Sequence, residues 1–192
     1  LSRLLDTAKA HNQFVRIDME GSDYTQATID LFKRALKTYQ GHVGIVLQAY
    51  LHRTEKDVAD LAALGADIRL CKGAYREPAN IALQSMDDIR AAYKEYAKVL
   101  IEKTAFPRMA THDGSLVTWL QEYATSEGLA KDRFEFQMLY GLREKTMNEL
   151  SADGWKTCIY VPYGTMWFPY FTRRLMERKE NVFFIATTLL KP

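Results

Sequence analysis

Short apolar runs alternate with longer amphipathic stretches along nearly the whole chain, and this alternation occurs six times. Each run is rich in β-branched or aromatic residues and ends near a polar, Gly or Pro residue, which is typical of strands. The stretches between the runs repeat apolar residues every three or four positions, which is typical of amphipathic helices. The expected strands are 14–18, 43–50, 68–75, 107–113, 134–141 and 158–164, and the expected helices are about 23–39, 54–64, 85–103, 114–128, 143–153 and 165–178.

Strand and helix in strict alternation predict an α/β fold with a parallel sheet, whose strands we expect to be buried on both faces. The turn after the first run, DMEGSDY, lacks the glycine-rich patterns that mark the nucleotide site of a doubly wound sheet. A polar residue instead stands near the end of nearly every run, which favours a TIM-type (β/α)8 barrel with its site at the mouth. These residues are Asp18, Gln48, Lys72, His112, Gln137 and Tyr160.

The length of the chain fits only part of such a barrel. Eight units take about 250 residues, and the 192 residues hold about six. Residues 1–11 read as the second half of an amphipathic helix, so we expect two units before residue 1 and open sheet edges in the present chain. No linker-like change of composition divides residues 1–192, which we interpret as one domain, the carboxyl-terminal portion of a catalytic barrel.

Charge and hydrophobicity exclude several classes of function. The 26 basic and 24 acidic side chains give a net charge of +2, so nothing favours binding to a nucleic-acid backbone. No apolar stretch is long enough for a membrane span and no signal peptide is visible, which predicts a cytoplasmic protein. Cys71 and Cys158 lie singly in apolar runs and no second ligand accompanies His112, so we expect neither disulfide nor metal site.

Several of the residues at the run ends have more than one possible role. Asp18 is either a turn cap or a carboxylate that orients a cation at the mouth. Lys72 is a contact to a phosphate or cofactor, a Schiff-base nucleophile, or a structural ion-pair partner. Arg69 lies inside a strand and needs a buried partner, for which Asp18 or Glu135 is available.

The remaining polar residues also leave two interpretations each. His112 is either a structural histidine or a catalyst at a strand-to-helix turn. Gln48 and Gln137 either satisfy neighbouring backbone groups or bind the edge of a planar ring.

An aromatic-rich helix near the end of the chain carries Arg173 and Arg174, with Glu177 about one turn later. Adjacent arginines are often only a solvated helix face. Paired guanidinium groups also bind a carboxylate in bidentate fashion, and Glu177 would hold one of them in place. On that interpretation the substrate is small and acidic or zwitterionic.

Seven motifs together resemble the proline dehydrogenase family, in that family's order and spacing over nearly the whole chain. They are RIDME (16–20), VLQAY (46–50), RLCKGAYREP (69–78), ATHD (110–113), FEFQMLYG (134–141), YVPYG (160–164) and TRRLMER (172–178). The arrangement is most similar to the stand-alone bacterial enzymes, because the large bifunctional ones have a longer segment between the tyrosine and the double arginine.

The resemblance implies an FAD-dependent barrel enzyme that oxidises L-proline to 1-pyrroline-5-carboxylate, the first step of proline degradation to glutamate. Hydride would pass to flavin N5 and electrons to a membrane quinone, with the protein peripheral to the inner face of the membrane. Asp18 and Arg69 match catalytic positions. Flavin contacts match Met19, Gln48, Arg69, Lys72, Gly73, Ala74, Thr111 and His112. Arg173 and Arg174 match the carboxylate-binding pair, Glu177 their ion-pair partner, and Tyr75, Leu139 and Tyr160 the pocket walls.

Two departures from the family pattern are visible. The family has a substrate-binding lysine on a strand upstream of RIDME, where it pairs with the residue that Asp18 matches, and the present chain begins after that strand. Pro107 and Arg108 stand where an apolar strand is usual. We therefore expect residues 1–192 alone to bind FAD weakly or not at all. Two alternatives stay open: an aldolase-like barrel that uses Lys72 as a Schiff base, and an inactive truncated barrel kept as a scaffold.

Overall fold

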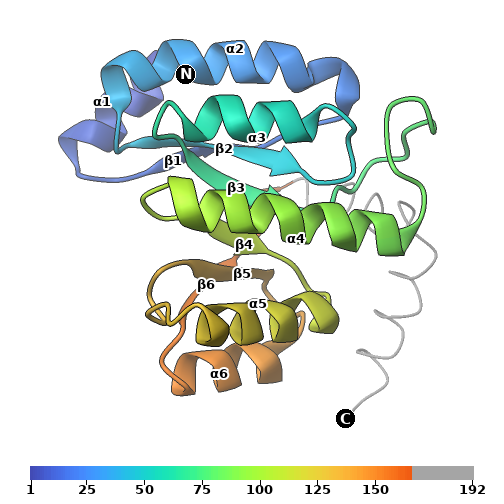
Figure 1. Cartoon of the computed structure of the whole chain (residues 1–192). Coiled ribbons are helices and arrows are strands. Elements are labelled where there is room, and N and C mark those ends of the chain that lie inside the picture. The colour runs from blue at the N-terminus through green and yellow to red at the C-terminus, as the bar shows by residue number, and fades with distance from the viewer. Residues whose placement is uncertain (166–192) are drawn as a thin grey trace.

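The computed structural model describes residues 1–165, which form one parallel sheet of six strands in the order β1-β2-β3-β4-β5-β6 (Figure 1). Each strand pairs in parallel with the next one along the chain. The strands are β1 (Val15–Ile17), β2 (Val43–Gln48), β3 (Asp67–Cys71), β4 (Arg108–Ala110), β5 (Glu135–Leu139) and β6 (Lys156–Tyr160). All six predicted strands are present, and each of them ends before the last residue predicted for it.

Helices connect the strands and lie along the outer face of the curved sheet (Figure 1). They are α1 (Ser2–Ala10), α2 (Ser22–Tyr39), α3 (Thr54–Ala62), α4 (Met86–Lys103), α5 (Gly114–Ser126) and α6 (Glu144–Ala152). A curled parallel sheet with helices on one side is part of a TIM-type barrel, which confirms the predicted fold class. The helix predicted at 165–178 lies almost entirely outside the described residues.

Local signals in the sequence set several of the boundaries. Asp113 accepts from the Ser115 N–H at 3.1 Å as the N-cap of α5, and Ser85 does the same for α4. Gly154 follows the end of α6 with a φ of 87°, a left-handed conformation that glycine adopts at low cost. Pro107 immediately precedes β4, so the ladder loses no donor there.

The prediction that the strands are buried on both faces is wrong for most of the sheet. Only β2 is buried at every position, whereas β3 alternates between buried and partly exposed residues. Ile68 and Leu70 face the helices and are fully buried, and Asp67 and Arg69 face the concave side. The concave face is therefore lined by charged groups, and the main apolar core lies between sheet and helices.

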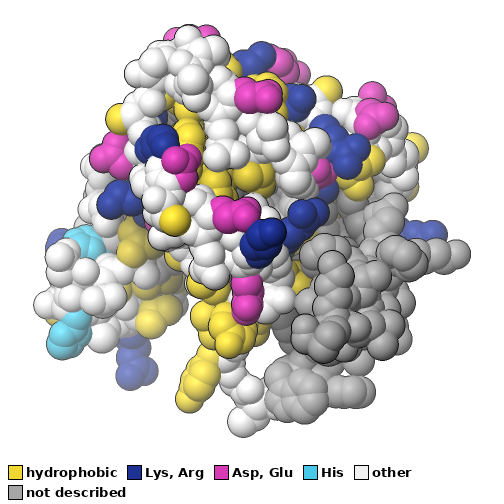
Figure 2. Space-filling model, turned by 90° about the horizontal axis from the view of Figure 1, so that it is seen from below, with side chains coloured by type: hydrophobic (Ala, Val, Ile, Leu, Met, Phe, Trp, Pro, Cys, Tyr) yellow, Lys and Arg dark blue, Asp and Glu magenta, His cyan; other side chains and the backbone are white. Residues whose placement is uncertain are grey.

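Strands β1 and β6 form the edges of the sheet among the described residues. Figure 2 views the molecule from the side of α6 and shows hydrophobic side chains gathered between surfaces of mixed charge. Exposed hydrophobic residues of and near β6 include Ile159, Val161 and Tyr163. Within residues 1–165, no helix is both long and apolar enough to cross a bilayer.

Candidate functional site

The carboxyl ends of the six strands meet at one edge, and the described candidate residues gather there in three linked groups. The first centres on Arg69 of β3, whose Nη1 donates to Asp18 Oδ1 at 2.9 Å. Tyr160, at the end of β6, donates its hydroxyl to the other Asp18 oxygen at 3.2 Å. The Arg69 guanidinium also lies 5.4 Å from the centre of the Tyr160 ring. Residues from β3, β6 and the end of β1 thus form one contact set.

This arrangement resolves the partner of Arg69. From the sequence, either Asp18 or Glu135 could be the carboxylate that pairs with Arg69, and the structure shows that it is Asp18. Glu135 pairs instead with Arg108 of the neighbouring strand. The Asp18 side chain is 52% exposed and that of Arg69 is 16% exposed, so the pair reaches from the sheet toward solvent at the mouth.

A second group ties two loops together. Gln48 Nε2 donates to the backbone carbonyl of Glu20 at 2.9 Å, so Gln48 satisfies a neighbouring backbone group. The Glu20 carboxylate accepts from the hydroxyl of Tyr75 in the loop after β3. The same loop carries Glu77, whose carboxylate accepts from both the Ser22 N–H and the Ser22 hydroxyl at 2.7 Å. Glu77 thereby satisfies the first turn of α2 and fixes the loop that bears Tyr75.

The third group surrounds Lys72 and Asp113. Lys72 Nζ donates to Asp113 Oδ2 at 3.0 Å, and Arg90 Nε donates to the same oxygen at 2.8 Å. Burial alone would raise the pKa of Asp113, but hydrogen bonds from Lys72, Ser115 and Arg90 outweigh it and hold that pKa well below its ordinary value. Asp113 is thus a carboxylate that fixes Lys72 at the mouth and caps α5 at once.

His112 lies beside this group and contacts β5. Its Nε2 accepts from the Leu139 N–H at 2.9 Å, which requires a neutral ring. Burial, together with the charges of Lys72 and Arg143, lowers the pKa of His112 to about 4. The histidine therefore joins the ends of β4 and β5 and holds the backbone of Leu139, an expected pocket wall.

Four other candidate residues lie at the same edge. Met19 and Thr111 are buried, and the Thr111 hydroxyl accepts from the Asp113 N–H at 3.1 Å. Gly73 and Ala74 follow Lys72 in the loop. Gly73 has a φ of 115°, and a Cβ there would lie 2.2 Å from the Tyr50 ring, so only glycine allows this close approach. Arg173, Arg174 and Glu177 lie outside the described residues.

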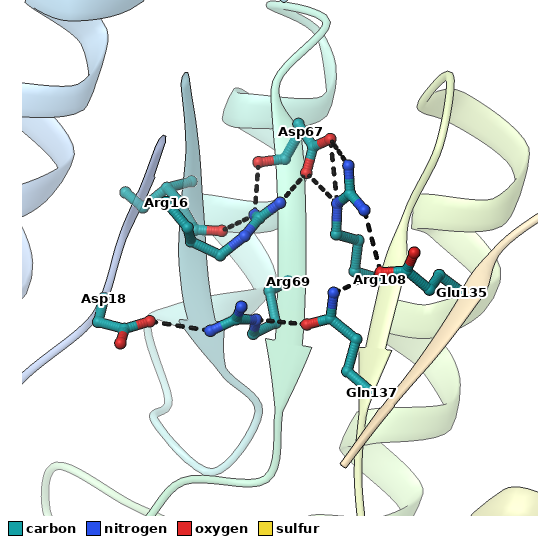
Figure 3. Close-up of polar contacts among 8 residues, drawn as sticks. Arg16, Asp18, Asp67, Arg69, Arg108, Glu135 and Gln137 are labelled. Atoms are coloured by element: carbon teal, nitrogen blue, oxygen red, sulfur yellow. Dashed lines mark hydrogen bonds and ion pairs between the residues drawn. The ribbon is translucent and has the colours of Figure 1, made fainter. Parts of the chain in front are cut away.

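Beneath the mouth, the concave face carries an ion network that we did not predict from the sequence (Figure 3). Arg16 of β1 donates to Asp67 of β3, and Arg108 Nη2 donates to the other Asp67 oxygen at 2.9 Å. Arg108 Nη1 reaches Glu135 of β5 at 3.0 Å. Asp67 lies one residue before the strand predicted at 68–75, and its place on the same face as Arg69 follows from the observed start of β3.

Burial shapes the charges in this network. Burial lowers the pKa of Arg16 to about 10 despite the attraction of Asp67, and the like charges of Arg69 and Arg108 add to the effect. For Arg108 burial acts in the same direction, but the hydrogen bond and charge of Asp67 and the charge of Glu135 outweigh it and raise its pKa. The network thus keeps three guanidinium groups close together only because carboxylates separate them.

The chemistry of the site suits an electron-rich, phosphate-bearing group. Arg69 and Lys72 face the mouth as cations held by carboxylates, and the first turn of α5 adjoins Lys72 through Asp113. Lys72 Nζ lies 3.0 Å from an Asp113 oxygen, so the ion-pair role that the sequence left open for Lys72 is present in the structure. Among residues 1–165, no cluster of three or more His, Cys, Asp or Glu side chains could hold a metal ion.

Comparison with known proteins gives consistent results. The family model described as proline dehydrogenase matches residues 1–187. Proline dehydrogenase 2 of Bacillus subtilis is 42% identical over 191 residues, which cover all of this chain and 63% of that protein. Proline dehydrogenase of Deinococcus radiodurans is 35% identical over 98% of this chain and 61% of its own length. The chain thus spans less than two thirds of these relatives.

Comparison with solved structures points to related proteins. A crystal structure of proline utilization A from Bdellovibrio bacteriovorus superimposes with a TM-score of 0.84 at 26% sequence identity. The match covers 93% of this chain and 21% of that one.

Proposed function

This chain belongs to the proline dehydrogenase family, and from that premise we propose that its protein oxidises L-proline to 1-pyrroline-5-carboxylate with bound FAD. Residues 1–192 would form the carboxyl-terminal portion of the catalytic barrel. The observation that carries the proposal is the contact set of Arg69, Asp18 and Tyr160, because three separate family motifs supply one residue each to a single charged cluster.

The described residues fit the flavin. Lys72 at the first turn of α5 is suited to a phosphate, and the Arg69 guanidinium is suited to an electron-rich ring. Gly73, Ala74, Gln48, Met19, Thr111 and His112 would line the same edge. When bound, FAD supplies the acceptor for the hydride that leaves proline C5.

The residues of this chain would bind and orient the substrate. Arg173 and Arg174, with Glu177 as their ion-pair partner, would hold the proline carboxylate. Tyr75, Leu139 and Tyr160 would form walls that exclude water and fix the ring. Asp18 would meet the cationic amine of proline, since its carboxylate is the exposed end of the ion pair with Arg69.

The test is an anaerobic visible spectrum of the purified full-length protein before and after addition of L-proline. We expect a bound-flavin band that bleaches with proline. Asp18→Asn is the matched variant, because the amide keeps the size of the carboxylate and removes its charge; we expect retained flavin and bleaching slowed about a hundredfold. A protein that binds no flavin, or a flavin that proline leaves oxidised, would refute the proposal.

We further propose a membrane quinone as the electron acceptor, met by peripheral contact with the inner face of the membrane. Proline-dependent reduction of a quinone in anionic lipid vesicles, faster than reduction of the same quinone in detergent, would support this. Equal rates in both would count against the membrane contact.

A further inference from the structure

Gln137 of β5 lies between a cation and an anion on the concave face (Figure 3). Its Oε1 accepts from Arg69 Nε at 2.6 Å, and its Nε2 donates to Glu135 Oε1 at 2.5 Å. Gln137 is only 5% exposed, so these neighbours rather than water decide how the amide is oriented.

The two ends of this amide are not interchangeable. A reversed amide would place Nε2 against the Arg69 N–H and Oε1 against the Glu135 carboxylate, which leaves two donors and two acceptors face to face. An unsatisfied buried polar group costs about 1–3 kcal/mol. Glu135 and Arg69 therefore fix the direction of the Gln137 amide together, and Glu135 anchors the end of the amide that lies away from Arg69.

Glu135 is itself held in place. Arg108 Nη1 donates to the same Glu135 oxygen at 3.0 Å, and Arg108 binds Asp67 through its Nε and Nη2. Because Asp67 also accepts from Arg16, the anchor reaches across the sheet to β1. The orientation of Glu135 is thus determined by groups that lie away from the mouth.

We propose that Glu135 and Gln137 are positioning residues for Arg69. The Gln137 acceptor holds Arg69 Nε, which leaves Nη1 directed at Asp18 and the guanidinium beside the Tyr160 ring. The inference rests on the proposed function for the consequence of this placement, because Arg69 and Asp18 act on flavin and proline there.

The first test reads the Arg69 side chain without flavin or proline. In the full-length apoprotein labelled with ¹⁵N-arginine, the Arg69 Nε–H signal is identified by its loss in Arg69→Lys. We expect Glu135→Gln to speed exchange of this proton with water at least about tenfold, because the Gln137 amide then loses the fixed acceptor for its Nε2 and is held by Arg69 alone. Asp67→Asn removes the same charge but leaves the Glu135–Gln137 bond, and we expect a change below about threefold.

The second test exchanges the two residues. In the double variant Glu135→Gln with Gln137→Glu, the amide at 135 donates to a carboxylate at 137, which accepts directly from Arg69 Nε. We expect slow exchange of the Arg69 proton to return. In the flavin-loaded protein, we expect the rate of flavin reduction by L-proline to fall about tenfold in Glu135→Gln and to recover to within about threefold in the exchanged variant.

The outcomes separate this inference from the proposed function. Unchanged Arg69 exchange in Glu135→Gln, or no recovery in the exchanged variant while its flavin content and melting temperature stay normal, would overturn the positioning role. A wild-type protein that does not oxidise proline would refute the proposed function alone, since the exchange measurement decides the positioning role in the apoprotein.

Discussion

His112 makes the stability of the protein depend on pH between about 6.5 and 4. Its Nε2 accepts the Leu139 N–H at 2.9 Å, so protonation of that nitrogen would set two donors against each other. Burial and the nearby charges of Lys72 and Arg143 lower the pKa of His112 from 6.5 to about 4. The folded protein therefore resists the proton that the unfolded chain accepts.

The size of the effect follows from this difference in pKa. Between pH 6.5 and 4 the unfolded chain binds more protons than the folded one, so the free energy of unfolding falls as pH falls through this window. One proton contributes about 1.4 kcal/mol per pH unit. Relative to pH 8, the loss from His112 is about 2 kcal/mol at pH 5 and about 3 kcal/mol at pH 4.

Urea unfolding at 25 °C, repeated from pH 8 to pH 5, measures this loss. His112→Gln is the matched variant, because its side-chain oxygen can accept the Leu139 N–H and does not titrate. We expect the wild-type protein to lose about 2 kcal/mol more than the variant over this range. Asp113 does not interfere, since its lowered pKa affects stability only below its ordinary value of 3.8.

The same experiment can refute the reasoning. Wild type and His112→Gln with parallel pH profiles would show that His112 takes up its proton equally in both states. An NMR titration of the folded protein gives an independent reading, and a His112 pKa near 6.5 would have the same meaning.

Three substitutions test other parts of the site. Gly44→Ala should lower the free energy of unfolding in urea by about 2–4 kcal/mol. The added Cβ would lie 2.7 Å from both Arg16 Nη1 and the Phe14 ring and 2.8 Å from the Asp67 carbonyl oxygen. A loss below about 0.5 kcal/mol would contradict the packing. Asp113→Asn should cost about 3 kcal/mol at pH 7, since Lys72 loses its buried carboxylate partner, and urea unfolding with an unchanged midpoint would contradict this. Gly73→Ala should lower flavin content per chain about tenfold, because a Cβ collides with the Tyr50 ring at positive φ, and full flavin content would argue against this loop as part of the flavin site.

The order of the elements could be predicted because it depends on local signals. The spacing of apolar residues, the helix caps and the helix-ending glycines predicted the helix bounds almost to the residue. For example, α2 was expected at 23–39 and spans Ser22–Tyr39. The strands ended earlier than expected, because their last residues are polar or turn-forming. At β4, for example, Thr111 and His112 already belong to the loop.

The site could be predicted only in part, because local sequence patterns do not determine which residues of different strands lie side by side. The family motifs predict Asp18, Arg69 and Tyr160 as members of one site, and the structure places these three side chains in contact. Sequence reasoning left Asp18 and Glu135 open as partners of Arg69; Asp18 is the partner, and parallel register sets Arg108 directly beside Glu135. A shift of one residue in that register would have turned one of these two side chains to the helices, so only the structure settles the pairing.

The charged concave face explains why the site residues come as a set. Replacing a buried ion network by apolar side chains often leaves a fold as stable or more so, so stability alone does not account for three guanidinium groups and three carboxylates here. Toward the amino end, Asp67 pairs with Arg16 and Arg108, and Arg108 pairs with both Asp67 and Glu135. The network becomes exposed only at the carboxyl end, at Asp18, where its side chain is 52% exposed. The network therefore orients a single carboxylate toward the mouth, and a change at Gln137 or Glu135, which hold Arg69, should be measurable there as altered geometry before it is measurable as unfolding.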